Sequence, residues 1–102
     1  MSLASESTLH CLYASPNSGA ALRLLAQIAP REPVLLLSKA VLLADASHPQ
    51  VPRWITSGAV IYALDEDLQA YAVTNVHAAI TRTSYADWVL LSERCPTQTL
   101  WR

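Results

Sequence analysis

The sequence predicts an α/β fold with three layers, in which helices cover both faces of a five-stranded, mostly parallel sheet. Two observations support this prediction. Short apolar or β-branched runs alternate along the chain with segments of helical periodicity. The clearest runs also lack polar alternation, which is typical of strands that are buried on both faces of a parallel sheet. The five expected strands occupy residues 8–14, 33–37, 59–64, 78–83 and 97–101.

The first expected strand, "TLHCLYA" at 8–14, is followed by the turn residues "SPNSG". The segment "AALRLLAQIA" then predicts a helix that has Leu24 and Ile28 on its apolar face and Arg23 on its solvent face. Pro30 is expected to end this helix, because proline cannot continue it.

The second half of the expected sheet follows the same alternation. The buried strand "PVLLL" at 33–37 leads into "SKAVLLADAS", which predicts a short helix over 38–47. We expect the next segment, "HPQVPRWITSG" at 48–58, to be a loop. The strand "AVIYAL" at 59–64 precedes a helix over 65–73, "DEDLQAYAV", whose three leading acids are favoured by the helix dipole.

The chain closes with a weaker strand, "AAITRT", and a helix, "SYADWVLLSERC". Ser84 and Asp87 resemble a capping box at the start of this helix, and Trp88 and Leu91 lie on one stripe of it. Pro96 is expected to end the helix, because the residue before a proline avoids the α region. The last strand, "TQTLW", follows, and a right-handed crossover places it beside the first strand.

Length and composition predict one domain whose surface is partly buried against other subunits. Residues 1–7 are expected to be a flexible polar leader, and residues 8–102 a single domain. Hydrophobic residues make up 52% of the chain, enough for a packed core. Charged residues make up only 15%, which is low for a small monomer and predicts surfaces that are buried against other subunits.

Composition also excludes several classes of function. The net charge is −1 and the seven basic residues are scattered singly, so no direct contact with nucleic acid is expected. Two glycines are too few for a dinucleotide or triphosphate loop, so no cofactor is expected. The chain shows neither a membrane-length apolar run nor the pattern of a signal peptide. We therefore expect a cytoplasmic protein that makes no membrane contact.

The carboxyl ends of the strands form the usual functional edge of a parallel sheet. Polar residues follow the first three strands at this edge, and the terminal tryptophan is expected to be either a core residue or a subunit contact. The candidates for a binding or interface role are Ser15, Asn17, Ser18, Lys39, Asp65, Asp67 and Trp101. Two interpretations of "SPNSG" are open, a small-anion site or an ordinary turn with a capping residue. The acids suit acid–base or metal chemistry, or a surface role next to the helix dipole.

No catalytic residue and no metal ligand is predicted. His10, His48 and His77 are far apart in sequence, and none has a Cys or His at ligand spacing. Cys11 lies mid-strand among apolar neighbours, where burial makes a thiol inert. Cys95 lies at a helix C-terminus, the wrong end for stabilising a thiolate.

Four segments together resemble the TusB/DsrH family: "LHCLYASP", "VLLL", "IYALDEDLQA" and "CPTQTLW". They run from Leu9 to Trp101 in the family's order and spacing, and "YALDEDL" with the terminal "P-T-Q-x-x-W" is the most specific part. The resemblance implies a DsrEFH-like fold, which is similar to the Rossmann and flavodoxin folds.

The resemblance also implies partners and a pathway. Members of the family assemble with TusC/DsrF-like and TusD/DsrE-like subunits as a dimer of heterotrimers. The TusBCD assembly passes persulfide sulfur from the TusA carrier towards TusE and the thiouridylase that makes 2-thiouridine at the tRNA wobble position. The DsrEFH relatives act in sulfur oxidation. In both assemblies the main sulfur-carrying cysteine belongs to the TusD/DsrE subunit.

Two departures from the family refine the prediction. DsrH-type members can carry a cysteine in the first helix, whereas "GAALRLLAQIA" has none, which favours the TusB-like role. Many members have an acidic-glycine turn after the second strand, where this chain has Ser38, Lys39 and Ala40. The sequence thus predicts a non-catalytic subunit of a TusBCD-like complex. The alternatives are a DsrH-like subunit of a sulfur-oxidation complex, a persulfide carrier that uses Cys11 or Cys95, and a stand-alone module that binds a small anion at "SPNSG".

Overall fold

The computed structural model describes residues 8–95 and 97–102. The expected leader over residues 1–7 and the predicted role of Pro96 in ending the last helix lie outside the described residues.

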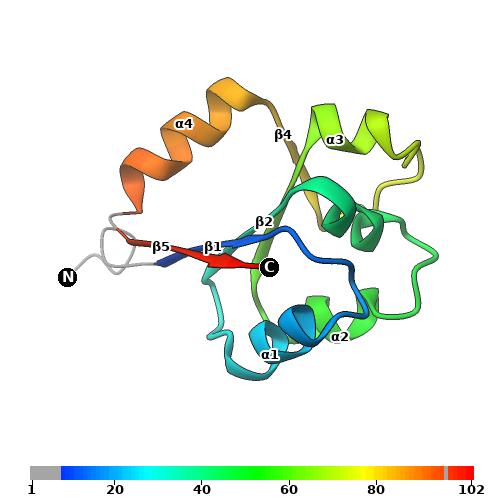
Figure 1. Ribbon diagram of the computed structural model, residues 1–102, viewed down its shortest axis with the longest axis horizontal. Coiled ribbons are helices and arrows are strands. Elements are labelled where there is room, and N and C mark those ends of the chain that lie inside the picture. The colour runs from blue at the N-terminus through cyan, green and yellow to red at the C-terminus, as the bar shows by residue number, and fades with distance from the viewer. Residues whose placement is uncertain (1–7, 96) are drawn as a thin grey trace.

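The five strands form one sheet in which every pairing is parallel, as predicted (Figure 1). The order across the sheet is β4-β3-β2-β1-β5, so β1 is flanked on both sides and the C-terminal strand is an edge. The expected crossover of the last strand to a place beside the first is therefore confirmed. The strands are β1 Thr8–Leu12, β2 Pro33–Leu36, β3 Val60–Leu64, β4 Thr81–Thr83 and β5 Thr97–Trp101.

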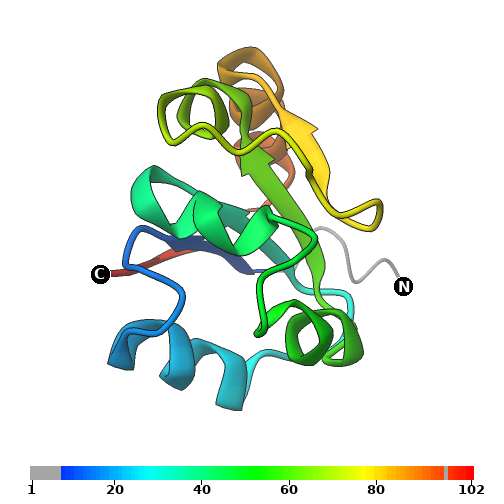
Figure 2. The ribbon, with the colours of Figure 1, turned by 90° about the vertical axis from the view of Figure 1, so that its right-hand side faces the viewer.

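The direction of these crossovers decides which helix covers which face. The chain steps from β1 to β4 in one direction, so right-handed crossovers place the intervening helices on one face of the sheet. The return from β4 to β5 runs the other way and carries α4 over the opposite face. Figures 1 and 2 show α1 and α2 on one side of the sheet and α4 on the other. The helices are α1 Gly19–Gln27, the 3-10 helix η2 Ser38–Ala44, α2 Val51–Thr56, α3 Asp65–Ala70 and α4 Tyr85–Arg94.

The two faces of the sheet carry cores of unequal size. Because side chains alternate along a strand, Leu12 of β1 faces the α1 side while Leu9 and Cys11 face α4. The larger core gathers buried residues from α1, η2, α2 and α3. The smaller core has a single helix above it, which contributes Leu91 and the half-buried Trp88. The α4 face is thus the less covered side of the molecule.

The prediction of a loop over residues 48–58 is wrong, because this segment contains the helix α2. Pro52 occupies the second position of α2, where a missing N–H costs no helical hydrogen bond. Trp54 is only 1% exposed and packs in the larger core. Burial of this indole stabilises a helix that the two prolines of the segment appeared to exclude.

Other elements are shorter than their predicted ranges. The helix expected over 38–47 is the 3-10 helix η2, and the strand expected over 78–83 is reduced to β4. The first helix ends at Gln27, before Pro30, with Ile28 already in an extended conformation. The cap expected at Ser84 is confirmed, since its hydroxyl accepts a hydrogen bond from the Asp87 N–H at 3.1 Å.

Two turns, one just before β2 and one just before β3, lie against each other. Arg31 and Gly58 both have positive φ angles, 71° and 82°. The Arg31 N–H donates to the Gly58 carbonyl at 2.8 Å, which holds the two turns together. Gly58 also packs closely on Pro30, since a Cβ at position 58 would lie 3.2 Å from the Pro30 Cβ.

We therefore expect Gly58→Ala to lower the free energy of unfolding by about 1–2 kcal/mol, because alanine is strained at positive φ and meets Pro30. Denaturant unfolding followed by circular dichroism measures the change. Gly19→Ala is the matched control. It lies at the first position of α1, where an added Cβ meets only the flexible end of Arg23, so it should be neutral or stabilising. Equal stability of the Gly58 variant and the unmodified chain would contradict this account of the turn.

Candidate functional site

The turn between β1 and α1 brings together Ser15, Asn17 and Ser18. The Ser18 hydroxyl accepts a hydrogen bond from the Ala21 N–H at 3.2 Å, and the Ser18 N–H donates to the Ser15 carbonyl at 3.0 Å. Asn17 is exposed. Ser18 is therefore the N-cap of α1, which is the ordinary-turn interpretation of these residues.

The carboxyl ends of β2 and β3 are joined by an aspartate. Asp67 Oδ2 accepts a hydrogen bond from the Ser38 N–H at 2.6 Å. Ser38 has a positive φ of 53° and begins η2, so Asp67 stabilises an unusual backbone conformation at a helix start that has no capping side chain of its own. Lys39, the next residue, is exposed. The structure gives Asp67 a role within the fold.

Asp65 links the ends of β3 and β4. Its Oδ1 lies 3.7 Å from Arg82 Nε, and its Oδ2 accepts a hydrogen bond from Gln69 Nε2 at 3.1 Å. The three acids at the start of α3 are in its first turn, as the sequence predicted. Asp65 and Asp67 therefore contact different partners, Arg82 and Ser38, rather than one shared site.

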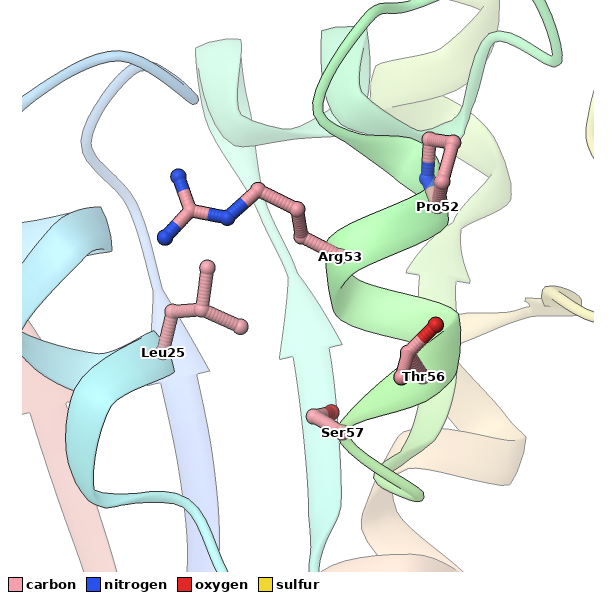
Figure 3. A pocket seen from close by; sticks show the side chains of 5 residues that line it. All are labelled: Leu25, Pro52, Arg53, Thr56 and Ser57. Carbon is pink, nitrogen blue, oxygen red and sulfur yellow. The ribbon is translucent and has the colours of Figure 1, made fainter.

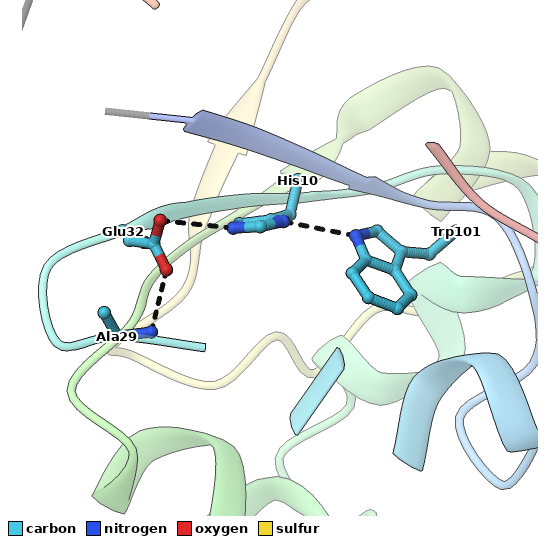
Figure 4. A network of polar contacts seen from close by, with 4 residues as sticks. All are labelled: His10, Ala29, Glu32 and Trp101. Carbon is cyan, nitrogen blue, oxygen red and sulfur yellow. Dashed lines mark hydrogen bonds and ion pairs between the residues drawn. The ribbon is translucent and has the colours of Figure 1, made fainter. Parts of the chain in front are cut away.

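Trp101 is part of a polar network on the α1 side of the sheet (Figure 4). Its indole Nε1–H donates to His10 Nδ1 at 3.1 Å, and His10 Nε2 lies 3.4 Å from Glu32 Oε2. The other oxygen of Glu32 accepts from the Ala29 N–H at 2.8 Å. Because Nδ1 accepts the indole proton, a neutral His10 carries its own proton on Nε2, which faces the carboxylate.

The surroundings of Trp101 bear on its two predicted roles, core residue and subunit contact. The side chain is half-buried and packs against the larger core, and its carbonyl accepts a hydrogen bond from the Tyr13 N–H at 2.9 Å. Trp101 therefore packs at the margin of the larger core and ties the terminal strand to β1. A further role as a subunit contact stays a prediction.

Both cysteines lie in the smaller core beneath α4. Burial raises the pKa of Cys11 to about 11, and the nearby Cys95 adds to the rise. Burial also raises the pKa of Cys95, although the charge of Arg94 acts in the opposite direction. A raised pKa lowers the fraction of thiolate, which is the nucleophilic form of cysteine. The inert character predicted for Cys11 agrees with these surroundings.

Two of the histidines come together although they are far apart in sequence. His48 and His77 line one open hollow beside α2. The Nδ1 of His48 accepts from the Gln50 N–H at 3.1 Å, and the Nδ1 of His77 accepts from the Ala79 N–H at 3.0 Å. Within residues 8–95 and 97–102, no group of three or more His, Cys, Asp or Glu side chains is placed to hold a metal ion.

A second hollow, of about 450 Å³, lies between α1 and α2 (Figure 3). Leu25 comes from α1, and α2 with its C-cap contributes Pro52, Arg53, Thr56 and Ser57. Arg53 is the one ionisable group among these lining residues, and its Nη1 donates to Gln50 at 3.3 Å. The hollow therefore lacks a second titratable group for acid–base chemistry.

The outer side of α4 and the neighbouring edge strand expose large apolar side chains. We call this the α4 surface; its residues are the exposed Tyr85, Val89, Leu90 and Leu100, with the half-buried Trp88 among them. Tyr85 stacks on Trp88, with ring centroids 5.8 Å apart, and Val89 is 58% exposed. The sequence indicates this surface through the apolar pair Val89 and Leu90. Helical periodicity places both residues outside the stripe of α4 that contains Trp88 and Leu91. An amphipathic helix with a polar outer side would have neither residue there.

Fold and site define a small α/β protein with an all-parallel five-stranded sheet, buried thiols and an exposed apolar helix face. The model of the family described as DsrH-like protein matches residues 14–98. The chain thus belongs to the DsrH-like family, which is the TusB/DsrH family of the sulfur relay group. A search of curated proteins finds no match to the chain. None of the helices in the described part of the chain is long and apolar enough to span a membrane.

The Trp101 network predicts an energetic coupling between two residues 91 positions apart. Trp101→Phe removes the indole donor and should lower the free energy of unfolding by about 1–2 kcal/mol, because the His10 acceptor is buried. In a His10→Phe background the same change should cost about 1 kcal/mol less. Urea unfolding of the four proteins gives the coupling. The half-exposed Leu100, changed to Ala, controls for local disturbance of β5. Equal costs of Trp101→Phe in both backgrounds would rule out the coupling.

The thiol surroundings predict slow alkylation. At neutral pH, iodoacetamide should modify Cys11 on the order of 10²-fold more slowly than a free cysteine peptide, because its pKa of about 11 leaves little thiolate. The rate should rise about tenfold per pH unit and not level off below about pH 10. Mass spectrometry of the labelled peptides separates Cys11 from Cys95. Modification of either residue as fast as the peptide at neutral pH would show an activated thiol.

Proposed function

We propose that the chain is a non-catalytic subunit of a TusBCD-like sulfur relay complex that serves 2-thiouridine formation at the tRNA wobble position. The observation that carries this proposal is the burial of both thiols, Cys11 and Cys95, beneath α4. Membership of the DsrH-like family supplies the sulfur relay context.

A sulfur carrier needs a thiolate that can reach its donor and acceptor. Persulfide transfer proceeds by attack of a thiolate on the transferred sulfur, so both accessibility and a low pKa favour it. Cys11 is fully buried and Cys95 is 4% exposed, and the pKa of each is raised. These features argue against the alternative in which Cys11 or Cys95 carries the persulfide. They support a subunit that positions a partner with the reactive cysteine.

The choice between tRNA thiolation and sulfur oxidation depends on the first helix. DsrH-type members can carry a cysteine there, whereas α1 consists of Gly19–Gln27 without one. This absence favours the TusB-like role. The DsrH-like subunit of a DsrEFH complex is the alternative within the same family.

The α4 surface supports assembly with other subunits. Its exposed Tyr85, Val89, Leu90 and Leu100 would be covered by a partner, in line with the low content of charged residues in the chain. We propose TusC/DsrF-like and TusD/DsrE-like partners in a dimer of heterotrimers, with TusA-like and TusE-like carriers as indirect partners. The site of action is the cytoplasm. Other proteins of the relay contact the tRNA, since this chain has a net charge of −1.

Co-expression with TusC-like and TusD-like subunits tests the assembly. The unmodified chain should elute with both partners from size-exclusion chromatography. Val89→Asp places a charge on the α4 surface and should reduce co-elution at least tenfold, because the desolvated carboxylate would lack a partner. Leu22→Asp on α1 is the matched control, since Leu22 is also exposed but lies on the opposite side of the sheet.

Two outcomes of this experiment would count against the proposal. If the unmodified chain elutes alone in the presence of both subunits, the subunit role fails. If Leu22→Asp abolishes co-elution and Val89→Asp does not, assembly uses the α1 side instead of the α4 surface. Circular dichroism of both variants establishes that each is folded before the comparison.

A further inference from the structure

A small cavity that is open to solvent lies at the amino-terminal edge of the sheet, away from the edge that the sequence singled out. Its volume is about 170 Å³, and it sits between the end of α4 and the starts of β2 and β3. Two arginines, Arg31 and Arg94, are among the residues that line it. The rest of the lining is mostly apolar: Pro33, Val60, Tyr62, Leu91 and Cys95.

The two arginines are brought to the cavity by well-defined backbone. Arg31 has a left-handed φ of 71°, and its N–H donates to the Gly58 carbonyl at 2.8 Å. Arg94 is the last residue of α4 and precedes Cys95, which is buried in the smaller core. The turn before β2 and the end of α4 therefore bring two arginines to one cavity, although they lie 63 positions apart in the sequence.

No carboxylate of the described residues lies within ion-pair distance of either arginine. Glu32 follows Arg31 directly, but its carboxylate accepts from the Ala29 N–H and faces His10. Two like charges at one small cavity repel each other, and an anion between them would replace that repulsion by charge-assisted hydrogen bonds. Arginine presents its donors in a planar fork that matches the oxygens of an oxyanion.

The size of the cavity selects the class of ligand. Pockets for drug-sized molecules have volumes of roughly 300–1,000 Å³, which exceeds this cavity. A water molecule takes about 30 Å³, so the cavity has room for an ion larger than water. Burial raises the pKa of Cys95, so its thiol stays neutral and does not repel an anion beside it. A tetrahedral oxyanion meets both limits.

We propose that this cavity binds a small inorganic oxyanion, such as sulfate, thiosulfate or phosphate, between the guanidinium groups of Arg31 and Arg94. These ions share the chemistry that the cavity recognises, three or more oxygens with a double negative charge. The inference goes beyond the proposed function, which assigns no ligand to this chain.

Titration of the chain followed by backbone amide NMR tests the site. Sulfate, thiosulfate and phosphate are added separately at constant ionic strength. Saturable shifts should appear at Val60, Leu91 and Cys95, which line the cavity. The relative response to the three ions shows whether sulfur or phosphorus oxyanions are preferred. Shifts that do not saturate, or that spread over the whole surface, would show only nonspecific screening and would overturn the proposal.

Variants connect the shifts to the two arginines. Arg31→Gly removes the guanidinium while keeping a residue suited to positive φ, so the fold is retained. Arg94→Gln removes the second charge at the exposed end of α4. Each should weaken binding at least tenfold, and Arg23→Ala, on the exposed side of α1, should leave it unchanged.

If Arg31→Gly and Arg94→Gln bind the ion as tightly as the control Arg23→Ala, the proposed site is refuted. Because the titration uses the chain without partner subunits, its failure leaves the assembly experiment unaffected, and failure of assembly leaves this result standing.

Discussion

The pairing of the C-terminal strand with β1 is the constraint on which the rest of the structure depends. β5 pairs with β1 along its whole length, from Thr8 with Thr97 to Leu12 with Trp101. The indole of Trp101 then donates to buried His10, so side chains reinforce the backbone ladder at the very end of the chain. This pairing draws α4 back over the sheet, since the connection from β4 must cross to the opposite face. A sheet that ended at β1 would leave the smaller core open to water.

The same constraint explains why both cysteines are buried and why a surface remains uncovered. α4 alone covers its face, so it seals Cys11 and Cys95 in the smaller core. Burial there disfavours the thiolate, which is the opposite of what a sulfur carrier needs. One helix has no second layer outside it, however, and Val89 and Leu90 face solvent. Buried thiols and an apolar outer surface are therefore two results of one topology, and together they support the proposed subunit role.

The sequence predicted the parts of this fold that depend on local pattern. Continuous apolar runs located β2 and β3, β-branched residues indicated β4, and Ser84 located the start of α4. α2 escaped prediction because its first turn contains a proline and its stability depends on burial of Trp54, which is a tertiary effect. Among the candidate site residues, Ser18 was recognisable as a cap from its place before a helix. The contact of Asp67 with Ser38 depends on how neighbouring strand ends meet in space. A local sequence pattern cannot predict such a contact, because Ser38 and Asp67 are 29 positions apart.

The central claim is that this chain takes part in sulfur relay without carrying sulfur, and cysteine substitution in the assembled complex tests it most directly. A chain with both Cys11→Ala and Cys95→Ala is assembled with TusC-like and TusD-like subunits, and transfer of labelled sulfur from a TusA-like donor to a TusE-like acceptor is measured. We predict the same transfer rate as with the unmodified chain. Loss of transfer by an intact complex would contradict the account, because one of these two thiols would then be part of the relay.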